Sequence, residues 1–329
     1  MTRTPAVALS GPLPDPAAVR LLLLSTLALL LLLTGAARAH GPTPAALGVA
    51  AGEAGHLWLV RLSEGMAVDD GTGWRYLCPA AWDGPATPLV VSSGSAGEPA
   101  WLVSTKGLRR IAADGQVTAS PAGELAPLST LGIAAVEGQI RAMERRDDGT
   151  AFWALGDAEP VLLGTSPQKW RSQVAFEGAA RVARVQDGSL IVGEVGATGQ
   201  VGAVQTWELE EAPGTTPTLR ATPFGLYVVL RSVEQTTCVR ITADGPKVLH
   251  TSPEAIFGPA AIGGDAAEIA IVTDGALLRV GDGGATLIDD AVRWTCLGHE
   301  PGGAYACNFG DVHRLNADGT VGARLFGLD

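Results

Sequence analysis

The sequence is poor in lysine, and no cluster of basic residues stands out along it. Lysine occurs only at Lys106, Lys169 and Lys247. Because nucleic-acid binding needs a concentrated basic surface, we expect no nucleic-acid partner. The formal net charge is −11, and this acidity is typical of a protein that stays soluble outside the cytoplasm.

Helical periodicity and the common catalytic motifs are also missing. After about residue 50, no stretch repeats apolar residues with a helical period, so we expect an almost purely β protein. The motif G-x-S-x-G, the phosphate-binding P-loop and the dinucleotide fingerprint are absent. No two of the five histidines stand at metal-ligand spacing. The sequence therefore offers no catalytic residue, no cofactor or cofactor-binding residue, and no metal ligand.

The first recognisable feature is a targeting segment at the start of the chain. Arg3 and Arg20 precede a leucine-rich run over residues 21–33, and a small-x-small pattern follows at residues 37–39. The run is short for a membrane span, which needs about 20 residues. We therefore expect a signal peptide over residues 1–39, cleavage after Ala39, and an exported protein without a stable membrane span. An uncleaved anchor is the alternative.

Four cysteines follow the targeting segment and are enough for two disulfides. Cys296 and Cys307 flank a predicted hairpin around Pro301-Gly302, and a turn there sets them opposite each other. We therefore predict a disulfide between Cys296 and Cys307. Two readings stay open for Cys78 and Cys238, which either pair with each other or remain buried free thiols.

A short phrase recurs along the chain, and each copy reads as a β-strand that runs into a tight turn. Copies stand at residues 110–115, 240–245 and 314–319, with a shorter relative at 279–283. Each ends in Asp-Gly, which suits a tight turn because Gly accepts positive φ and Asp can bond its own backbone. We expect the Asp-Gly pairs on one rim of the fold, with structural-turn roles for Asp69, Asp114, Asp244, Asp282 and Asp318.

Around these phrases the chain divides into units of four short antiparallel strands. The Asp-Gly pairs near the unit ends stand 34 to 57 residues apart, and the longest interval leaves room for a long loop or an additional turn. Residues 40–329 divided into seven units give about 41 residues each, the length of a four-stranded propeller blade. The predicted fold class is therefore all-β, a single seven-bladed β-propeller domain over residues 40–329. One β-sandwich, or two, is the alternative.

Two segments resemble the Asp-box of sialidase-like and BNR-repeat propellers, whose pattern is S-x-D-x-G-x-T-W. Residues 67–74 keep the Asp, Gly and Trp of this pattern, and residues 280–287 keep the Asp, Gly and Thr. The rhythm of the units is similar to that of exported bacterial propellers of this type over most of the chain. The resemblance implies a propeller fold in which the Asp-box is a structural turn.

The residues for sialidase chemistry are not recognisable. That family uses a set of arginines, a Tyr nucleophile with a Glu partner, and an Asp acid–base. Only Tyr76, Tyr227 and Tyr305 are available, each within a strand pattern, and the Arg-Ile-Pro signature is absent. For each tyrosine we favour core packing over catalysis. The eight tryptophans are spread over the units, which favours packing between blades over a sugar-stacking surface.

We therefore expect an exported, monomeric binding or scaffold propeller that is not an enzyme. Loops from every blade of a propeller meet around one central mouth, so we expect a protein or glycan ligand there. The alternatives are an Asp-box-class glycoside hydrolase and a structural interaction module without a small ligand. Convergent arginines and carboxylates at one mouth would favour the enzyme. An aromatic or polar ring without an acid–base pair would favour the binder.

Overall fold

The chain divides into two units, residues 1–42 and 43–329, and every described residue belongs to the second. The predicted signal peptide over residues 1–39 and its cleavage site lie outside the described residues. No helix among the residues described is long and apolar enough to cross a membrane. The computed structural model describes residues 46–51, 57–62, 65–69, 71–82, 89–91, 100–104, 107–112, 115–119, 130–136, 139–155, 160–209, 215–262, 268–281, 283–300 and 303–327.

Seven antiparallel sheets form this unit, and each is built from four consecutive strands. Blade 1 contains β1 (Ala46–Ala51), β2 (Leu57–Leu62), β3 (Gly65–Asp69) and β4 (Trp74–Leu77), and a short 3-10 helix η2 (Pro79–Trp82) follows it. Blade 2 contains β5 (Leu89–Val91), β6 (Ala100–Ser104), β7 (Gly107–Ile111) and β8 (Val117–Ala119). Blade 3 contains β9 (Thr130–Val136), β10 (Gln139–Arg146), β11 (Gly149–Leu155) and β12 (Val161–Ser166). Blade 4 contains β13 (Ser172–Phe176), β14 (Ala179–Gln186), β15 (Ser189–Val195) and β16 (Val201–Glu208). Blade 5 contains β17 (Thr216–Thr222), β18 (Gly225–Arg231), β19 (Thr236–Thr242) and β20 (Gly245–Ser252). Blade 6 contains β21 (Ile256–Ala261), β22 (Ile269–Thr273), β23 (Ala276–Gly281) and β24 (Gly284–Asp289). Blade 7 contains β25 (Trp294–Glu300), β26 (Gly303–Asn308), β27 (Asp311–Leu315) and β28 (Val321–Gly327).

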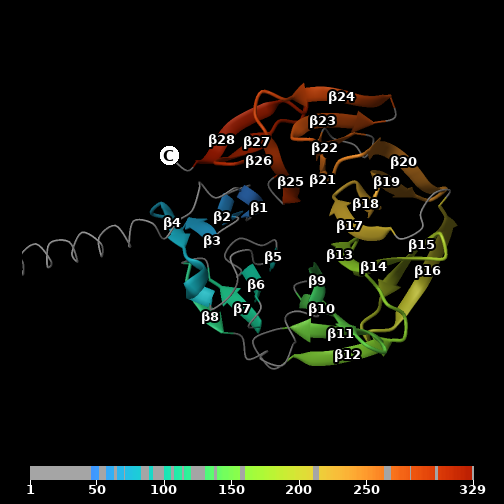
Figure 1. Ribbon diagram of the computed structural model, residues 1–329. Helices are drawn as coiled ribbons and strands as arrows, with labels where there is room; N and C mark the ends of the chain where they lie inside the picture. Colours follow the sequence, from blue (N-terminus) through green and yellow to red (C-terminus); the bar gives the residue numbers. More distant parts are fainter. Residues whose placement is uncertain are drawn as a thin grey trace, which may run out of the picture. The chain divides into compact units, whose positions relative to one another are not determined.

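The sheets are arranged radially as the blades of a propeller (Figure 1). The first strand of each blade lies near the centre, and the fourth lies at the outside. First strands of successive blades contact one another from β5 to β25, and β1 contacts β25 where the ring closes. The predicted all-β, seven-bladed propeller is confirmed, and the β-sandwich alternative is wrong.

The Asp-Gly pairs lie on both faces of the propeller, so the expectation of a single rim is wrong. In a four-stranded meander, the turns between strands 1 and 2 and strands 3 and 4 share one face, which we call the hairpin face. Asp69, Asp244 and Asp318 lie at turns of this face, between third and fourth strands, whereas Asp114 and Asp282 lie outside the described residues. Asp148 and Asp187 stand between second and third strands, on the opposite face.

This alternation explains the uneven spacing of the Asp-Gly pairs. The 34-residue interval ends at Asp148, which stands between second and third strands and so one turn earlier in its blade than Asp69, Asp244 and Asp318. The interval from Asp187 to Asp244 is 57 residues, because Asp187 lies between the second and third strands of blade 4, whereas Asp244 lies between the third and fourth strands of blade 5. The long interval therefore contains no additional blade.

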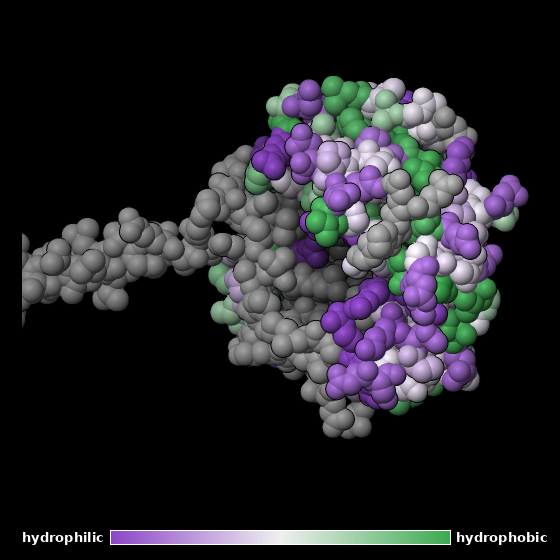
Figure 2. Space-filling model, turned by 45° about the vertical axis from the view of Figure 1, so that its right-hand side comes forward, coloured by the Kyte–Doolittle hydropathy of each residue, from purple (hydrophilic) through white to green (hydrophobic). Residues whose placement is uncertain are grey.

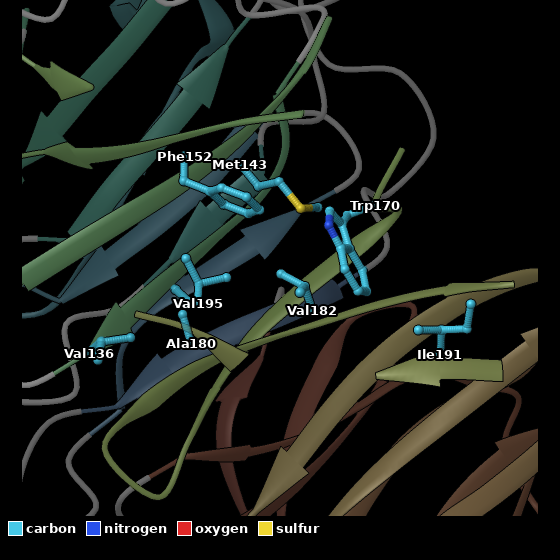
Figure 3. Packing of buried hydrophobic residues seen from close by; sticks show 9 residues of the cluster. Val136, Met143, Phe152, Trp170, Ala180, Val182, Ile191 and Val195 are labelled. Atoms are coloured by element: carbon cyan, nitrogen blue, oxygen red, sulfur yellow. The ribbon is translucent and has the colours of Figure 1, made fainter. Parts of the chain in front are cut away.

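The core consists of apolar clusters between neighbouring blades. Figure 3 shows the junction of blades 3 and 4, where Met143 and Trp170 point toward each other above Val182. Trp101 and Trp294 are buried in the same way between blades 2 and 3 and blades 6 and 7. Burying one large apolar side chain contributes about 1.5–3 kcal/mol, so these clusters hold the blades together. The packing role that we predicted for tryptophan therefore applies to these three.

The ring closes without a blade shared between the two ends of the chain. The closing junction, between blades 7 and 1, contains the predicted disulfide between Cys296 and Cys307, whose Cα atoms are 4.9 Å apart. Both cysteines are buried in one cluster with Val60 of blade 1. Trp74 and Phe326 add an edge-to-face contact across the junction, with ring centroids 4.7 Å apart.

Candidate functional site

Two of the three predicted turn aspartates that the structure describes form hydrogen bonds within their own turns. Asp69 accepts a hydrogen bond from the backbone N–H of Gly71 at 3.0 Å. The Oδ1 atom of Asp318 accepts the hydroxyl of Thr320 at 2.6 Å and its backbone N–H at 2.9 Å. These bonds from Thr320 lower the pKa of Asp318. Asp244 makes no side-chain hydrogen bond with any residue in the described segments.

The three tyrosines weighed as nucleophiles lie in strands. Tyr227 on β18 and Tyr305 on β26 are completely buried. Burial also raises the pKa of Tyr227, whose hydroxyl bonds to the side chain of Thr222. Tyr76 lies on β4, the outermost strand of blade 1, and is half-buried. Tyr227 and Tyr305 therefore have the surroundings of core residues and face no open site.

A hollow near the middle of the propeller is visible in the space-filling view, with a strongly hydrophilic residue inside it (Figure 2). Arg220 lies on the innermost strand β17, reaches solvent, and donates to the carbonyl of Leu219 at 3.2 Å. The surrounding protein displaces much of its hydration and lowers its pKa. Burial lowers the pKa of Arg61 on β2 as well, and the charge of Arg220 lowers it further. Blades 1 and 5 are not neighbours in the ring, so this repulsion acts between arginines of two separate blades.

A crevice of about 370 Å³ opens on the hairpin face between blades 4 and 5. Blade 4 supplies the turn after β13 and parts of β14, β15 and β16. Blade 5 supplies the turn after β17 and the turn after β19. We call it the blade 4–5 crevice. Its lining residues are Phe176, Glu177, Arg181, Val192, Ala203, Gln205, Phe224, Gly225, Leu226, Arg240, Ile241, Thr242 and Ala243.

The crevice lies over the apolar core shared by blades 4 and 5. Val192 and Leu226 line it from within that core and are almost fully buried. Phe176 packs on the edge of the same cluster, whereas Phe224 stands in a turn and is 39% exposed. An apolar floor beside an exposed aromatic ring is a typical surface for the hydrophobic part of a small ligand.

Two arginines give the crevice its polar character. Arg181 lies directly opposite Glu194 across β14 and β15, and its Nη1 atom forms an ion pair with that carboxylate at 2.9 Å. Arg240 on β19 is half-buried, and its cross-strand neighbours are Tyr227 and Lys247. None of the residues that the structure describes forms a hydrogen bond or ion pair with the Arg240 guanidinium. That guanidinium is therefore free to bind an anionic group.

One wall of the crevice contains a strained residue. The pairing of β15 with β16 shifts between Val192 and Glu194, so that Ala203 and Val204 both face Gly193. Ala203 has a φ of 45° in this bulge and lines the crevice. A non-glycine residue at such a φ costs about 1–3 kcal/mol and persists only where its surroundings fix it, which is common at binding sites.

Metal ligands are not assembled within the described part of the chain. No group of three His, Cys, Asp or Glu residues is placed to hold a metal ion among those residues. The ring of His299 bonds to the carbonyl of Ala261, and burial lowers its pKa. This contact joins blade 7 to blade 6, so His299 has the surroundings of a structural histidine.

The sequence did not lead us to the crevice, because its residues carry no recognisable motif. Arg240 begins one of the recurrent phrases and was assigned only to a strand end. Phe224 stands one residue before a predicted strand. The expected ligand site was the central mouth, whereas the crevice lies at a blade junction beside it. The lining residues of the crevice come from separate strands, and only the pairing of those strands brings them together.

The chain matches no protein-family model and no curated protein. Its fold is similar to that of a streptogramin B lyase, with a TM-score of 0.55, 14% identity, and coverage of 81% of this chain and 91% of the lyase. It is also similar to the extracellular domain of a hybrid two-component system from B. thetaiotaomicron, with a TM-score of 0.60 and 8% identity. That match covers 82% of this chain and 38% of the other. A puromycin-hydrolyzing peptidase from Mycobacterium tuberculosis matches with a TM-score of 0.57 and 15% identity over 87% of this chain and 54% of its own. At these identities, the likeness concerns the fold alone.

Proposed function

We propose that this protein is an exported binding propeller without catalytic activity, and that its ligand occupies the blade 4–5 crevice. The observation that carries the proposal is the unpartnered guanidinium of Arg240 beside an apolar floor and the exposed ring of Phe224. A volume of about 370 Å³ lies within the range of small-molecule sites. The site therefore suits a small ligand with one apolar and one polar part.

The lining of the crevice favours binding over glycoside cleavage. A retaining glycosidase needs two carboxyl groups about 5 Å apart, or a Tyr nucleophile with its Glu partner. Glu177 is the one carboxylate in the lining, and it stands at the exposed tip of a turn. No tyrosine belongs to the lining. Two arginines without an acid–base pair fit recognition of a ligand better than its hydrolysis.

The proteins of similar structure do not help to decide between ligand binding and glycoside cleavage. Their names describe a lyase, an extracellular domain and a peptidase, so one fold serves unrelated roles. The function proposed for this chain therefore rests on the residues of its own crevice.

Export is part of the same proposal. Disulfides form and persist mainly in oxidising compartments, and the Cys296–Cys307 bond fits that setting. The extracellular domain among the neighbours has a similar fold. We propose cleavage after Ala39, and N-terminal sequencing of the exported protein should begin at His40.

The binding proposal is tested by a thermal-shift screen of the purified protein against a library of amino-acid derivatives, aryl acids and sugars. A true ligand should raise the melting temperature of the native protein and of Phe309→Ala, but not of Phe224→Ala. Phe309 is a matched control because it is also an exposed phenylalanine in a turn, outside the crevice. A ligand that stabilises all three proteins equally would place the site elsewhere. Turnover of aryl glycosides or sialosides would favour the hydrolase instead.

A further inference from the structure

We propose that the ligand of the blade 4–5 crevice is a small monocarboxylate with an apolar or aromatic body, and that its carboxylate binds Arg240. This inference rests on the proposed binding function and adds the chemical class of the ligand. Its basis is a comparison of equivalent positions in blades 5 and 6.

Arg240 belongs to a set of arginines that recurs on the third strands. Arg110 on β7, Arg279 on β23 and Arg314 on β27 are other members, and the two at positions 110 and 314 have interaction partners. Arg279 forms an ion pair with Glu268. Arg240 is the member that forms no hydrogen bond or ion pair with any of the described residues.

The reason is a single position on the neighbouring strand. In blade 6, Arg279 pairs with Ala270, and its acidic partner Glu268 stands two residues earlier. In blade 5, Arg240 pairs with Tyr227, and the residue two positions earlier is Gly225. The acid that neutralises the arginine in blade 6 is therefore replaced in blade 5 by a residue with no side chain. Gly225 itself lines the crevice, and a Cβ there would lie 3.3 Å from the Tyr227 hydroxyl, so position 225 supplies no acid to Arg240.

The apolar lining determines the other half of the ligand. Phe176 and Phe224 come from the corresponding turns of blades 4 and 5, and Leu226 and Val192 lie below them. An aromatic or branched side chain buried there contributes through its apolar area. The arginine fork suits a planar carboxylate, which it can bind through two parallel hydrogen bonds.

The other charges in the crevice limit the ligand to one negative group. The Arg181 charge is already compensated by Glu194, and Glu177 adds a carboxylate at the rim. Counted together, the charges of Arg181, Arg240, Glu177 and Glu194 sum to zero, and Arg240 is the arginine of this set that has no ion-pair partner among the described residues. A second negative group on the ligand would be repelled by the carboxylate of Glu177, which lines the crevice.

The test uses N-acetyl-L-phenylalanine and its neutral amide as probes, with dissociation constants measured by NMR titration of the full purified protein. The two probes have nearly the same shape, and the charge is the main difference between them. We expect the carboxylate to bind about tenfold more tightly than the amide, since a hydrogen bond to a charged group contributes about 1.5–3 kcal/mol. Arg240→Gln should remove this preference. The matched control Arg231→Gln, at the opposite end of β18 from the crevice, should keep it.

The outcomes separate this inference from the binding proposal. Equal affinity for both probes, weakened alike by Phe224→Ala, would overturn the carboxylate assignment and leave the crevice as a binding site. A preference for the carboxylate that survives Arg240→Gln would also overturn it. If neither probe binds, the assignment is wrong, and the library screen with Phe224→Ala then decides whether the crevice binds any other ligand.

Discussion

Two cysteines lie outside the disulfide, and burial gives them different chemistry. Cys78 is exposed and Cys238 is buried, and both are free thiols. Burial raises the pKa of Cys238 to about 12, because the thiolate would lose its hydration in the blade interior. The thiolate is the reactive form, so Cys238 behaves as a small core residue.

We expect iodoacetamide at pH 8 to modify Cys78 but not Cys238 in the native protein. Denaturation without reduction should make both accessible, while Cys296 and Cys307 stay protected by their disulfide. Peptide mapping by mass spectrometry measures each site. Labelling of Cys238 in the native protein at the rate of Cys78 would contradict its burial.

At the scale of the strand and its turn, the copies of the recurrent phrase are not equivalent. The Asp-Gly glycines at positions 245 and 319 both adopt positive φ, of 120° and 84°. The aspartates differ. Asp318 accepts hydrogen bonds from the backbone N–H and the hydroxyl of Thr320, whereas Asp244 forms no side-chain hydrogen bond with any described residue. The backbone turns differ too, because Thr242 pairs with Gly245 around a two-residue loop, whereas Leu315 pairs with Val321 around a longer one.

We expect Asp318→Ala to lower the melting temperature more than Asp244→Ala. Since the folded-state pKa of Asp318 lies below its ordinary value of 3.8, its contribution is complete above that pH. The contribution is lost as the pH falls through the folded-state pKa, so the gap between wild type and Asp318→Ala should narrow as the pH falls below 3.8. Thermal denaturation of the three proteins at pH 7 and pH 3 measures this. Equal loss in both variants at pH 7 would show that the Thr320 bonds contribute nothing.

The strands were largely predictable from the sequence, whereas the crevice was not. β6 (Ala100–Ser104) is an example of a strand that can be read locally, because turn signals lie directly at both ends of its apolar run. The disulfide followed from hairpin geometry alone. Arg240 has no ion-pair partner among the described residues because Gly225 stands on β18 two residues before Tyr227, its cross-strand neighbour. The importance of Gly225 can be seen only when the register of β18 and β19 is known. Phe176 and Phe224 come together because blades 4 and 5 pack, which no local pattern encodes.

For the whole molecule, ring closure depends on side-chain packing between blades 7 and 1. Phe326 is almost fully buried there against Trp74 and the cluster that contains the disulfide. No strand crosses from one terminal blade into the other. The junction is therefore held by the same kind of apolar contact as those between the other blades.

We expect Phe326→Ala to reduce the free energy of unfolding by about 3–5 kcal/mol, the usual cost of truncating a buried phenylalanine. Phe309→Ala, which changes an exposed phenylalanine of the same blade, should change it by less than about 0.5 kcal/mol. Urea denaturation followed by tryptophan fluorescence compares the two. Similar stability of both variants would mean that the junction closes without this contact.

The self-contained blades have a consequence for the order of the chain itself. Because each sheet consists of four consecutive strands, moving the chain ends to another connection between blades would leave every strand pairing unchanged. A circular permutant that starts at β13 and ends at β12 keeps all seven sheets, and the crevice between blades 4 and 5 stays within one continuous stretch. The place where synthesis begins is thus separable from the architecture. A ring of this kind can change by duplication or loss of whole blades.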